Sequence, residues 1–239
     1  MPTINIVFEP EAQAGLPPQN PYAALSLRVA ELVREQLSEK PASNLALPTG
    51  RTPTGCYRVL SDWYAEGKLD WSQATAFALD EYYDVDERFS FRHYLEDHLY
   101  QQTNLRPAAR FNPILAADYD GVIAAAGGLD LALLGIGNNG HIAFNEPGTP
   151  LDSWTHSVIL TDSTRKANAE FFVNGEAPTR AVTVGLQTIL AAKKVILIAS
   201  GEQKRQILRR ALSEPVTADV PASFLQLHKQ LVLMTDFVV

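Results

Sequence analysis

Glycine, histidine and glutamate residues that could take part in chemistry gather in the stretch 135–148, GIGNNGHIAFNEPG. Its glycines follow the G-x-G-x-x-G spacing that binds a dinucleotide pyrophosphate where a strand joins a helix. That interpretation requires a crossover helix of about ten residues after the glycines. Pro147 lies seven residues after Gly140, and a proline inside such a helix would break it. The sequence therefore disfavours a dinucleotide site, and His141 and Glu146 need another explanation.

His141 and Glu146 are candidates for proton transfer, because a histidine oriented by a carboxylate is a common acid–base group. They are five residues apart, which would place them ~140° apart around a regular helix. They converge only if the chain turns between them, and the Asn-Glu-Pro-Gly segment at 145–148 favours a turn. A structural or surface imidazole is the alternative for His141. The other four histidines lack the spacing of metal ligands, so we expect no metal site.

Six short runs of Val, Ile, Leu and Ala alternate with longer helical patterns along the chain. Most of these runs are apolar on both faces, which is typical of strands buried beneath helices in a parallel sheet. They are INIVF, NLALP, ATAFAL, LDLALLGIG, KKVILIAS and QLVLMTD. The segments 21–40, 52–68 and 202–214 have the pattern of amphipathic helices. We predict an α/β fold with a single open, mostly parallel sheet and helices on both faces, a Rossmann-like three-layer α/β/α arrangement.

Length and composition fit a single domain over residues 1–239. No repeat or linker divides the chain, and the most loop-like stretch, 9–21, lies too near the start to be a boundary. The net charge of −7, from 27 acidic and 20 basic residues, argues against nucleic-acid and membrane partners. The single cysteine excludes an internal disulfide. Because the start lacks a signal-peptide pattern and no run reaches the ~18 apolar residues of a membrane helix, we expect a cytoplasmic protein.

The carboxyl ends of the strands are where such a fold binds ligands, and the loop LPTGRTP has the composition of a phosphate site. Gly50 ends the strand, and Thr52 is a candidate N-cap for a helix with Pro53 at its first position. The loop offers main-chain N–H groups, the hydroxyls of Thr49 and Thr52 and the guanidinium of Arg51 at a helix N-terminus. These groups suit a phosphate, with a plain capped turn as the alternative.

Asp80 and Glu81 come directly after the run ATAFAL, at a second strand end. A buried carboxylate is costly unless it has a task, so a carboxylate here is a candidate general base with a pKa raised by partial burial. The acidic residues that follow are typical of a solvated turn. They are Asp84, Asp86 and Glu87.

Lys204 falls in the first turn of the helix predicted after the run KKVILIAS. A cation is unusual there, because the helix dipole is positive at that end. A bound anion would explain the lysine, and a solvated side chain is the alternative.

Taken together, these strand ends resemble the glucosamine-6-phosphate deaminase family. The matching segments occur in the family's order and approximate spacing, from about residue 44 to about 228. They are LPTGRTP, FALDEYYDV, LDLALLGIGNNGHIAFNEPGTPLDS, DSTRKAN, AVTVGLQTIL, SGEQKRQIL and SFLQLH. The G-x-G-x-x-G-H-I-A-F-N-E-P core is the most specific of them.

The resemblance implies that glucosamine 6-phosphate and water are converted to fructose 6-phosphate and ammonia, without a metal or an organic cofactor. Asp80 matches the family's general base, which moves a proton between C2 and C1 through an enolamine. His141 matches the group that opens the sugar ring, and Glu146 matches its carboxylate partner.

The resemblance also implies where the substrate lies. Its phosphate would lie against the Thr49–Thr52 loop and Lys204, and the glycines, Gly137 among them, would bring the main chain close to the sugar. The segment from about 155 to 183 matches the family's mobile lid, and a lid that excludes water protects a reactive intermediate.

Two positions near the expected site depart from the family's pattern. Asn139 stands where the best-known members have a catalytic aspartate; an amide can orient His141 but cannot stabilise its charged form, so we expect a shifted pH optimum. Glu170 replaces the usual phosphate-binding arginine, and its carboxylate would repel a phosphate by roughly several kcal/mol in a poorly hydrated site. Arg51, at a position usually occupied by a small residue, is the candidate compensating cation. A different substrate is the alternative.

Other functions compete with a deaminase. The 6-phosphogluconolactonases share the Gly-His signature but continue towards Ser-Leu-Phe-Pro, so the Asn-Glu-Pro sequence at 145–147 favours the deaminase. A non-catalytic sugar-phosphate sensor would carry a DNA-binding module before its first strand, and a strand from residue 4 leaves no room for one. Activation by N-acetylglucosamine 6-phosphate is not expected, because His156 and Val158 replace the basic pair of longer members. The exact sugar, the direction of the reaction and the choice between monomer and homo-oligomer stay open.

Overall fold

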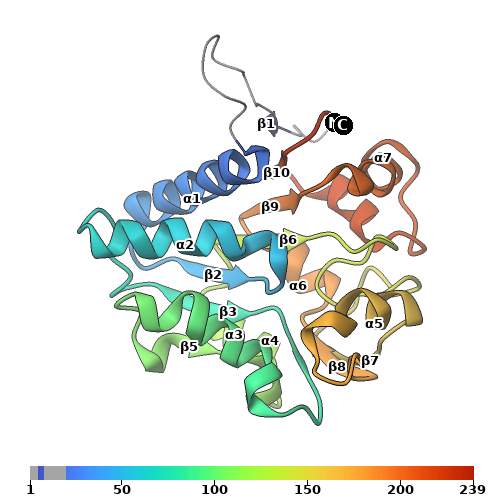
Figure 1. Cartoon of the computed structure of the whole chain (residues 1–239), viewed down its shortest axis with the longest axis horizontal. Coiled ribbons are helices and arrows are strands. Elements are labelled where there is room, and N and C mark those ends of the chain that lie inside the picture. Colours follow the sequence, from blue (N-terminus) through green and yellow to red (C-terminus); the bar gives the residue numbers. More distant parts are fainter. Residues whose placement is uncertain (1–4, 8–19) are drawn as a thin grey trace.

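The structure, a computed structural model, describes residues 5–7 and 20–239, so most of the loop-like stretch 9–21 lies outside it (Figure 1). Within these residues, seven strands form one parallel sheet in the order β1-β10-β9-β6-β2-β3-β5. The strands are β1 (Asn5–Val7), β2 (Asn44–Leu47), β3 (Thr75–Ala78), β5 (Arg110–Phe111), β6 (Leu131–Gly135), β9 (Lys194–Ala199) and β10 (Leu231–Thr235). Six of them coincide with the six apolar runs, and the two-residue β5 is an addition.

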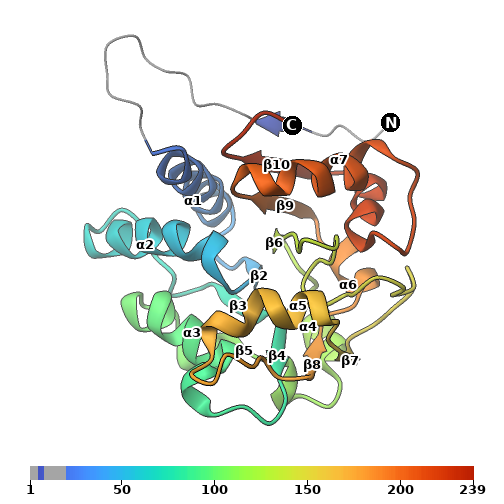
Figure 2. The same cartoon turned by 45° about the vertical axis from the view of Figure 1, so that its right-hand side comes forward.

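Helices cover both faces of this sheet, and each face has its own apolar core. The first face carries α1 (Pro21–Glu39), α2 (Arg51–Ala65) and α3 (Phe91–His98). Figures 1 and 2 show α1 beside α2. The second face carries α4 (Tyr119–Ala125), α6 (Leu186–Leu190) and α7 (Arg205–Ser213). Along β2, Leu45 and Leu47 join the first core and Ala46 joins the second. The predicted three-layer α/β/α fold is therefore confirmed. None of the helices described has the length and apolar character needed to cross a bilayer.

A second, antiparallel sheet was not indicated by the sequence. It has the order β4-β8-β7 and consists of β4 (Asp80–Tyr82), β8 (Arg180–Thr183) and β7 (His156–Ile159). Its strands have three or four residues each, too few to give a clear periodic pattern. Figure 2 shows this sheet beside α5 (Asp162–Asn168), at one end of the main sheet. Asp80 pairs with Thr183, so the sheet fixes the main chain of a candidate catalytic residue.

The start of α2 differs from the prediction that Thr52 caps it. The helix begins at Arg51, and Gly50 is its N-cap with φ 91° and no side-chain hydrogen bond. That φ favours glycine, because a residue with a Cβ rarely adopts it. The tight turn thus brings the strand end directly into the helix, and the first main-chain N–H groups of α2 have no partner within the helix.

Candidate active site

A cavity of about 930 Å³ lies among the loops that follow the strands and contains most of the residues predicted for the site. The predicted residues that line it are Thr49, Gly50, Arg51, Thr52, Asp80, Gly137, His141 and Lys204. Two others, Asn139 and Glu146, lie behind the imidazole of His141 and do not line the cavity. The segments meet here because the carboxyl ends of parallel strands lie at one edge of the sheet.

Asp80 presents a buried carboxylate to the cavity. Only 6% of the residue is exposed, and no described residue donates a hydrogen bond to its side chain. Burial, followed by the negative charge of Glu81, raises the pKa of the Asp80 carboxyl from 3.8 to about 8. Burial disfavours the charged form of a carboxyl, and a neighbouring negative charge adds to that effect. The predicted raised pKa is confirmed for Asp80.

Glu81 is buried as well, but all its contacts are structural. Its carboxylate accepts hydrogen bonds from the main-chain N–H groups of Tyr82, Phe91 and Arg92, at 2.8–2.9 Å. It accepts a fourth bond from Nδ2 of Asn112, at 2.9 Å. Phe91 and Arg92 begin α3, whose first N–H groups need such acceptors. The structure thus separates two adjacent acids, because only Asp80 lines the cavity.

His141 and Glu146 converge, as the sequence analysis required. The predicted turn is present, with Thr149 N donating to Glu146 O at 3.0 Å, but a second, earlier turn brings the two residues together. It spans Ile142–Asn145, with a hydrogen bond from Asn145 N to Ile142 O of 3.0 Å and Ala143 at φ 48°. Nδ1 of His141 lies 3.7 Å from Oε2 of Glu146. The loop after β6 therefore carries an imidazole–carboxylate pair instead of the helix a dinucleotide site needs.

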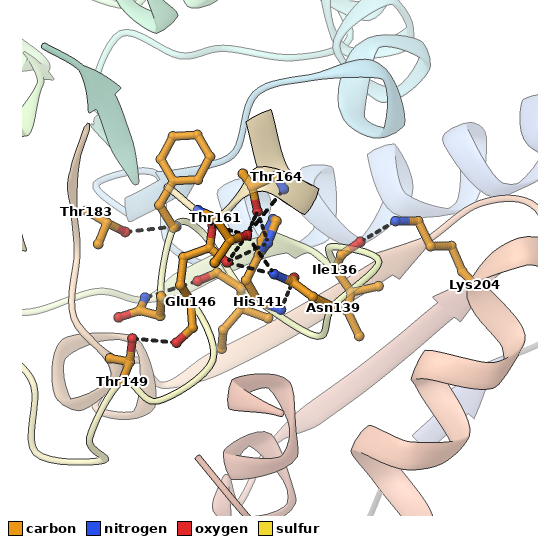
Figure 3. A network of polar contacts seen from close by, with 12 residues as sticks. Ile136, Asn139, His141, Glu146, Thr149, Thr161, Thr164, Thr183 and Lys204 are labelled. Carbon is orange, nitrogen blue, oxygen red and sulfur yellow. Dashed lines mark hydrogen bonds and ion pairs between the residues drawn. The ribbon is translucent and has the colours of Figure 1, made fainter. Parts of the chain in front are cut away.

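Glu146 is held by hydrogen bonds from two segments (Figure 3). Nδ2 of Asn139 donates to its Oε2 at 2.7 Å, and the main-chain N–H of Thr161 donates to its Oε1 at 3.2 Å. Burial by itself raises the pKa of Glu146, but contacts with His141, Thr164 and Asn139 outweigh it and lower the pKa to about 2. Glu146 is consequently a carboxylate at neutral pH, next to a histidine.

Asn139 contacts Glu146 and not the imidazole of His141. Its Oδ1 accepts a hydrogen bond of 3.2 Å from the main-chain N–H of His141, and its Nδ2 also lies 3.3 Å from Oγ1 of Thr161. The amide therefore orients the carboxylate partner of the histidine. The expected direct contact with the ring is absent among the described residues.

Gly137 makes room for the imidazole of His141. A Cβ at position 137 would overlap the ring, whereas a Cβ at Gly135 would meet no atom within 4 Å. The loop also closes on itself, since Gly137 N donates to His141 O at 2.9 Å. The second glycine of the motif is thus required by the packing of a histidine.

Lys204 reaches the same loop from the other side, as Figure 3 shows. Its Nζ donates to the main-chain oxygen of Ile136 at 2.8 Å, the contact drawn in the figure. It also donates to Oδ1 of Asn138 at 2.6 Å. Burial lowers the pKa of this lysine, and among the described residues its hydrogen-bond partners are neutral oxygens, with no carboxylate in ion-pair contact. It ends a 3-10 turn, Glu202–Lys204, directly before α7. A cation with neutral partners beside a cavity is suited to an anion.

Arg51 and Glu170 form an ion pair across the mouth of the cavity. Their side chains are 69% and 46% exposed. Exposed pairs of this kind contribute little to stability, about 0–1 kcal/mol, so an anionic ligand can compete for the guanidinium. The negative charge of Glu170 is therefore neutralised by Arg51, the residue predicted to compensate for it.

The sequence analysis missed residues that line or support the site, Thr161, Thr164 and Asp236 among them. Thr161 and Thr164 contact Glu146 and His141, and Asp236 accepts hydrogen bonds from Ser200 Oγ (2.5 Å) and Gly201 N (2.8 Å). Thr161 is the N-cap of α5, which the pattern TDST could have indicated. Asp236 carries no local signal, because its partners lie 35 and 36 residues away.

No group of three or more His, Cys, Asp or Glu side chains in the described part of the chain is arranged to hold a metal ion.

The fold agrees with comparisons to known proteins. Residues 18–234 match the family model described as glucosamine-6-phosphate isomerases/6-phosphogluconolactonase. The chain belongs to this family. Within it, the chain is 43% identical to a glucosamine-6-phosphate deaminase of Lachnoclostridium phytofermentans over 227 residues, which cover 90% of this chain and 96% of that one. It is 39% identical over 229 residues to glucosamine-6-phosphate deaminase 2 of Bacillus subtilis, covering 90% and 92% of the two chains.

Solved structures with the same fold agree with this assignment. A monomeric glucosamine-6-phosphate deaminase superposes with a TM-score of 0.86 at 37% identity, covering 90% of this chain and 93% of that one. A 6-phosphogluconolactonase of Thermotoga maritima shares the fold, with a TM-score of 0.68 at 23% identity and coverage of 89% and 95%. The deaminase is the nearer of these two in both sequence and structure.

Replacing Gly137 by alanine is expected to displace the imidazole and to lower kcat/KM about 100-fold, since a shift of about 1 Å in a catalytic group has that effect. The measurement is ammonia release from glucosamine 6-phosphate, the activity for which the relatives are named. Gly135→Ala, in the same motif but with free space around it, is the control and should stay within about threefold of the wild type. Equal losses in both variants would contradict the steric argument.

Replacing Asp80 by asparagine is expected to stabilise the fold at pH 8. The pKa of Asp80 is raised in the folded state, so the wild type loses stability as the pH rises from about 4 to about 8. The variant does not titrate, and each ~1 kcal/mol gained raises Tm by about 2–4 °C in a domain of this size. Thermal unfolding at pH 8 and pH 4 should show a gain that shrinks at pH 4. The exposed Asp84→Asn variant is the control, and a gain equal to that of Asp80→Asn would refute the assignment.

Proposed function

We propose that this protein is a glucosamine-6-phosphate deaminase, which converts glucosamine 6-phosphate and water to fructose 6-phosphate and ammonia. One observation carries the proposal: a buried carboxylate with a pKa of about 8, Asp80, lines the same cavity as the imidazole of His141, which is backed by Glu146. This reaction needs two catalytic groups: a base that transfers carbon-bound protons and an acid–base group that opens the sugar ring. The names of the relatives agree with it.

His141 is the proposed ring-opening group. When the pyranose opens, the C1–O5 bond breaks, the C1 hydroxyl loses its proton and O5 gains one. The contacts of His141 with Thr164 and Glu146 are through Nδ1, so among the described residues Nε2 has no hydrogen-bond partner. An imidazole that takes and returns a proton through Nε2 performs both transfers.

Asp80 then moves a proton along the open chain. Its carboxylate removes the proton from C2 while the C1 oxygen gains the proton that the C2 ammonium group loses, which gives an enolamine. Asp80 then returns its proton to C1, which gives an iminium ion at C2. Water adds to C2 and ammonia leaves, so that fructose 6-phosphate remains. A base with a pKa near 8 is matched to this task at neutral pH, because it accepts and releases the proton with similar ease.

The proposed substrate-binding groups are Lys204, the loop from Thr49 to Thr52 and the main chain at Gly137. Lys204 supplies a positive charge whose hydrogen bonds within the described chain go to neutral oxygens. The first turn of α2 supplies N–H groups without helical partners, together with two threonine hydroxyls and Arg51. These groups suit a phosphate at the rim of the cavity, with the sugar ring between them and His141.

We further propose that residues 1–239 form a single deaminase-like domain in which the segment from about 155 to 183 acts as a lid. In support, this segment contributes α5 and the 3-10 turn Ala169–Phe171 to one wall of the cavity, among them Thr164 and Phe171. A lid there would exclude water while the iminium ion forms. A cytoplasmic location without nucleic-acid or membrane partners is in keeping with the net charge of −7.

The proposed activity is tested by supplying glucosamine 6-phosphate and following ammonia and fructose 6-phosphate together. We expect the two products in equal amounts, and less than about 1% of the wild-type rate in Asp80→Asn, because the variant lacks the base. 6-Phosphogluconolactone is the control substrate. Its rapid hydrolysis, with no ammonia from the amino sugar, would overturn the proposal.

Arg51 is expected to bind the substrate phosphate in place of the usual arginine at position 170. Arg51→Gly should raise KM about tenfold or more with little change in kcat, because it removes binding shared by the ground and transition states. The double variant Arg51→Gly/Glu170→Arg restores the family's usual arrangement and should bring KM back toward the wild type. Glu170→Ala alone should lower KM, since Arg51 then has no competing carboxylate. Steady-state kinetics check all three, and an unchanged KM in Arg51→Gly would refute the exchange.

A further inference from the structure

The imidazole of His141 is in hydrogen-bond contact with a threonine, not with its carboxylate partner. Oγ1 of Thr164 lies 3.1 Å from Nδ1, within the range of a hydrogen bond. Oε2 of Glu146 lies 3.7 Å from the same nitrogen, which is too long for one. Within residues 5–7 and 20–239, Thr164 is the only hydrogen-bond partner of that nitrogen.

Thr164 is itself firmly placed. It is 1% exposed, and its main-chain N–H donates to Oγ1 of Thr161 at 3.3 Å. The hydroxyl of Thr161 lies 3.3 Å from both carboxylate oxygens of Glu146 and 3.2 Å from Oγ1 of Thr164. The two threonines at the start of α5 thus join the histidine to the glutamate, as the cluster of dashed lines in Figure 3 shows.

We propose that Thr164 is a positioning residue that holds His141 as its Nδ1–H tautomer and leaves Nε2 to exchange protons with the substrate; this rests on the proposed function. Nε2 acts as a base in the neutral imidazole and as an acid in the imidazolium, and Nδ1 carries a proton in both forms. The oxygen of Thr164 accepts that proton in both. The nearby negative charge of Glu146 favours the same tautomer.

The arrangement also couples the histidine to α5. Because Thr164 is contributed by α5, His141 has its hydrogen bond only when this helix is seated against the loop after β6. The same helix forms part of the cavity wall, so the wall and the proton-transfer group are completed together.

The first test is the tautomer of His141, measured from the imidazole 15N resonances of labelled protein at a pH where the ring is neutral. A His141→Gln variant assigns the resonances. In the wild type we expect the proton on Nδ1. Thr164→Val, which has nearly the same shape without the hydroxyl, should show a substantial share of the Nε2–H tautomer, and Thr164→Ser should resemble the wild type. A wild-type ring protonated at Nε2 would overturn the proposal even if the valine variant does not fold.

The second test separates positioning from binding. Thr164→Val should lower kcat for glucosamine 6-phosphate by about 10–100-fold with KM within about threefold, because general acid–base catalysis contributes about 10²–10⁴-fold. Thr164→Ser should recover most of the rate. Affinity for the acyclic 2-amino-2-deoxyglucitol 6-phosphate, measured by calorimetry, should stay within about twofold, since this probe has no ring to open.

Thr149→Val is the matched control, because Thr149 is also buried and its hydroxyl donates to the main-chain oxygen of Glu146 at 2.7 Å. It should leave the tautomer of His141 unchanged. Three results would each overturn the proposal. They are a wild-type kcat in Thr164→Val, a loss of kcat in Thr164→Ser equal to that in Thr164→Val, and a loss of affinity for the acyclic probe that matches the loss of kcat. Absence of ammonia release by the wild type would refute the proposed function alone, since the tautomer is measured without substrate.

Discussion

The buried carboxylate of Glu146 imposes the constraint on which the rest of the site depends. A charge removed from water is costly unless hydrogen bonds and an opposite charge replace the water. Here the donors come from Asn139 in the loop after β6 and from Thr161 at the start of α5, which lies 15 residues after Glu146 in the chain. The hydrogen bonds to this one carboxylate therefore require the loop after β6, the Ile142–Asn145 turn and α5 to pack together. The position of His141 follows from that packing.

Two acids of the site, Asp80 lining the cavity and Glu146 behind His141, have surroundings that drive their pKa values in opposite directions. Asp80 has burial and the adjacent Glu81 but no donor, and its pKa rises to about 8. Glu146 has donors and a histidine, and its pKa falls to about 2. Such divergence assigns different tasks to chemically similar groups. Asp80 is suited to accept and return a proton, whereas Glu146 is suited to remain charged beside His141.

Much of the fold follows from local patterns. The apolar runs predict the six longer strands of the main sheet. A strand buried on both faces is a continuous apolar run, which is easily distinguished from the polar segments on either side of it. Two of the three long helical patterns agree with α1 and α2, and the third is divided between a 3-10 turn and α7. The β4-β8-β7 sheet was missed, since strands of three or four residues gain their stability from pairing with segments far along the chain.

The sequence by itself determined the chemical types of the site, the order of its motifs and the family. Asp80, His141 and Glu146 follow from motifs that place reactive groups at strand ends, and Pro147 removed the dinucleotide alternative. Only the tertiary structure decided which acid faces the cavity, that Asn139 contacts the glutamate instead of the ring, and that Thr164 contacts the imidazole. Local spacing specifies elements, but these side-chain contacts join segments up to 23 residues apart that pack around a buried charge only in the folded chain.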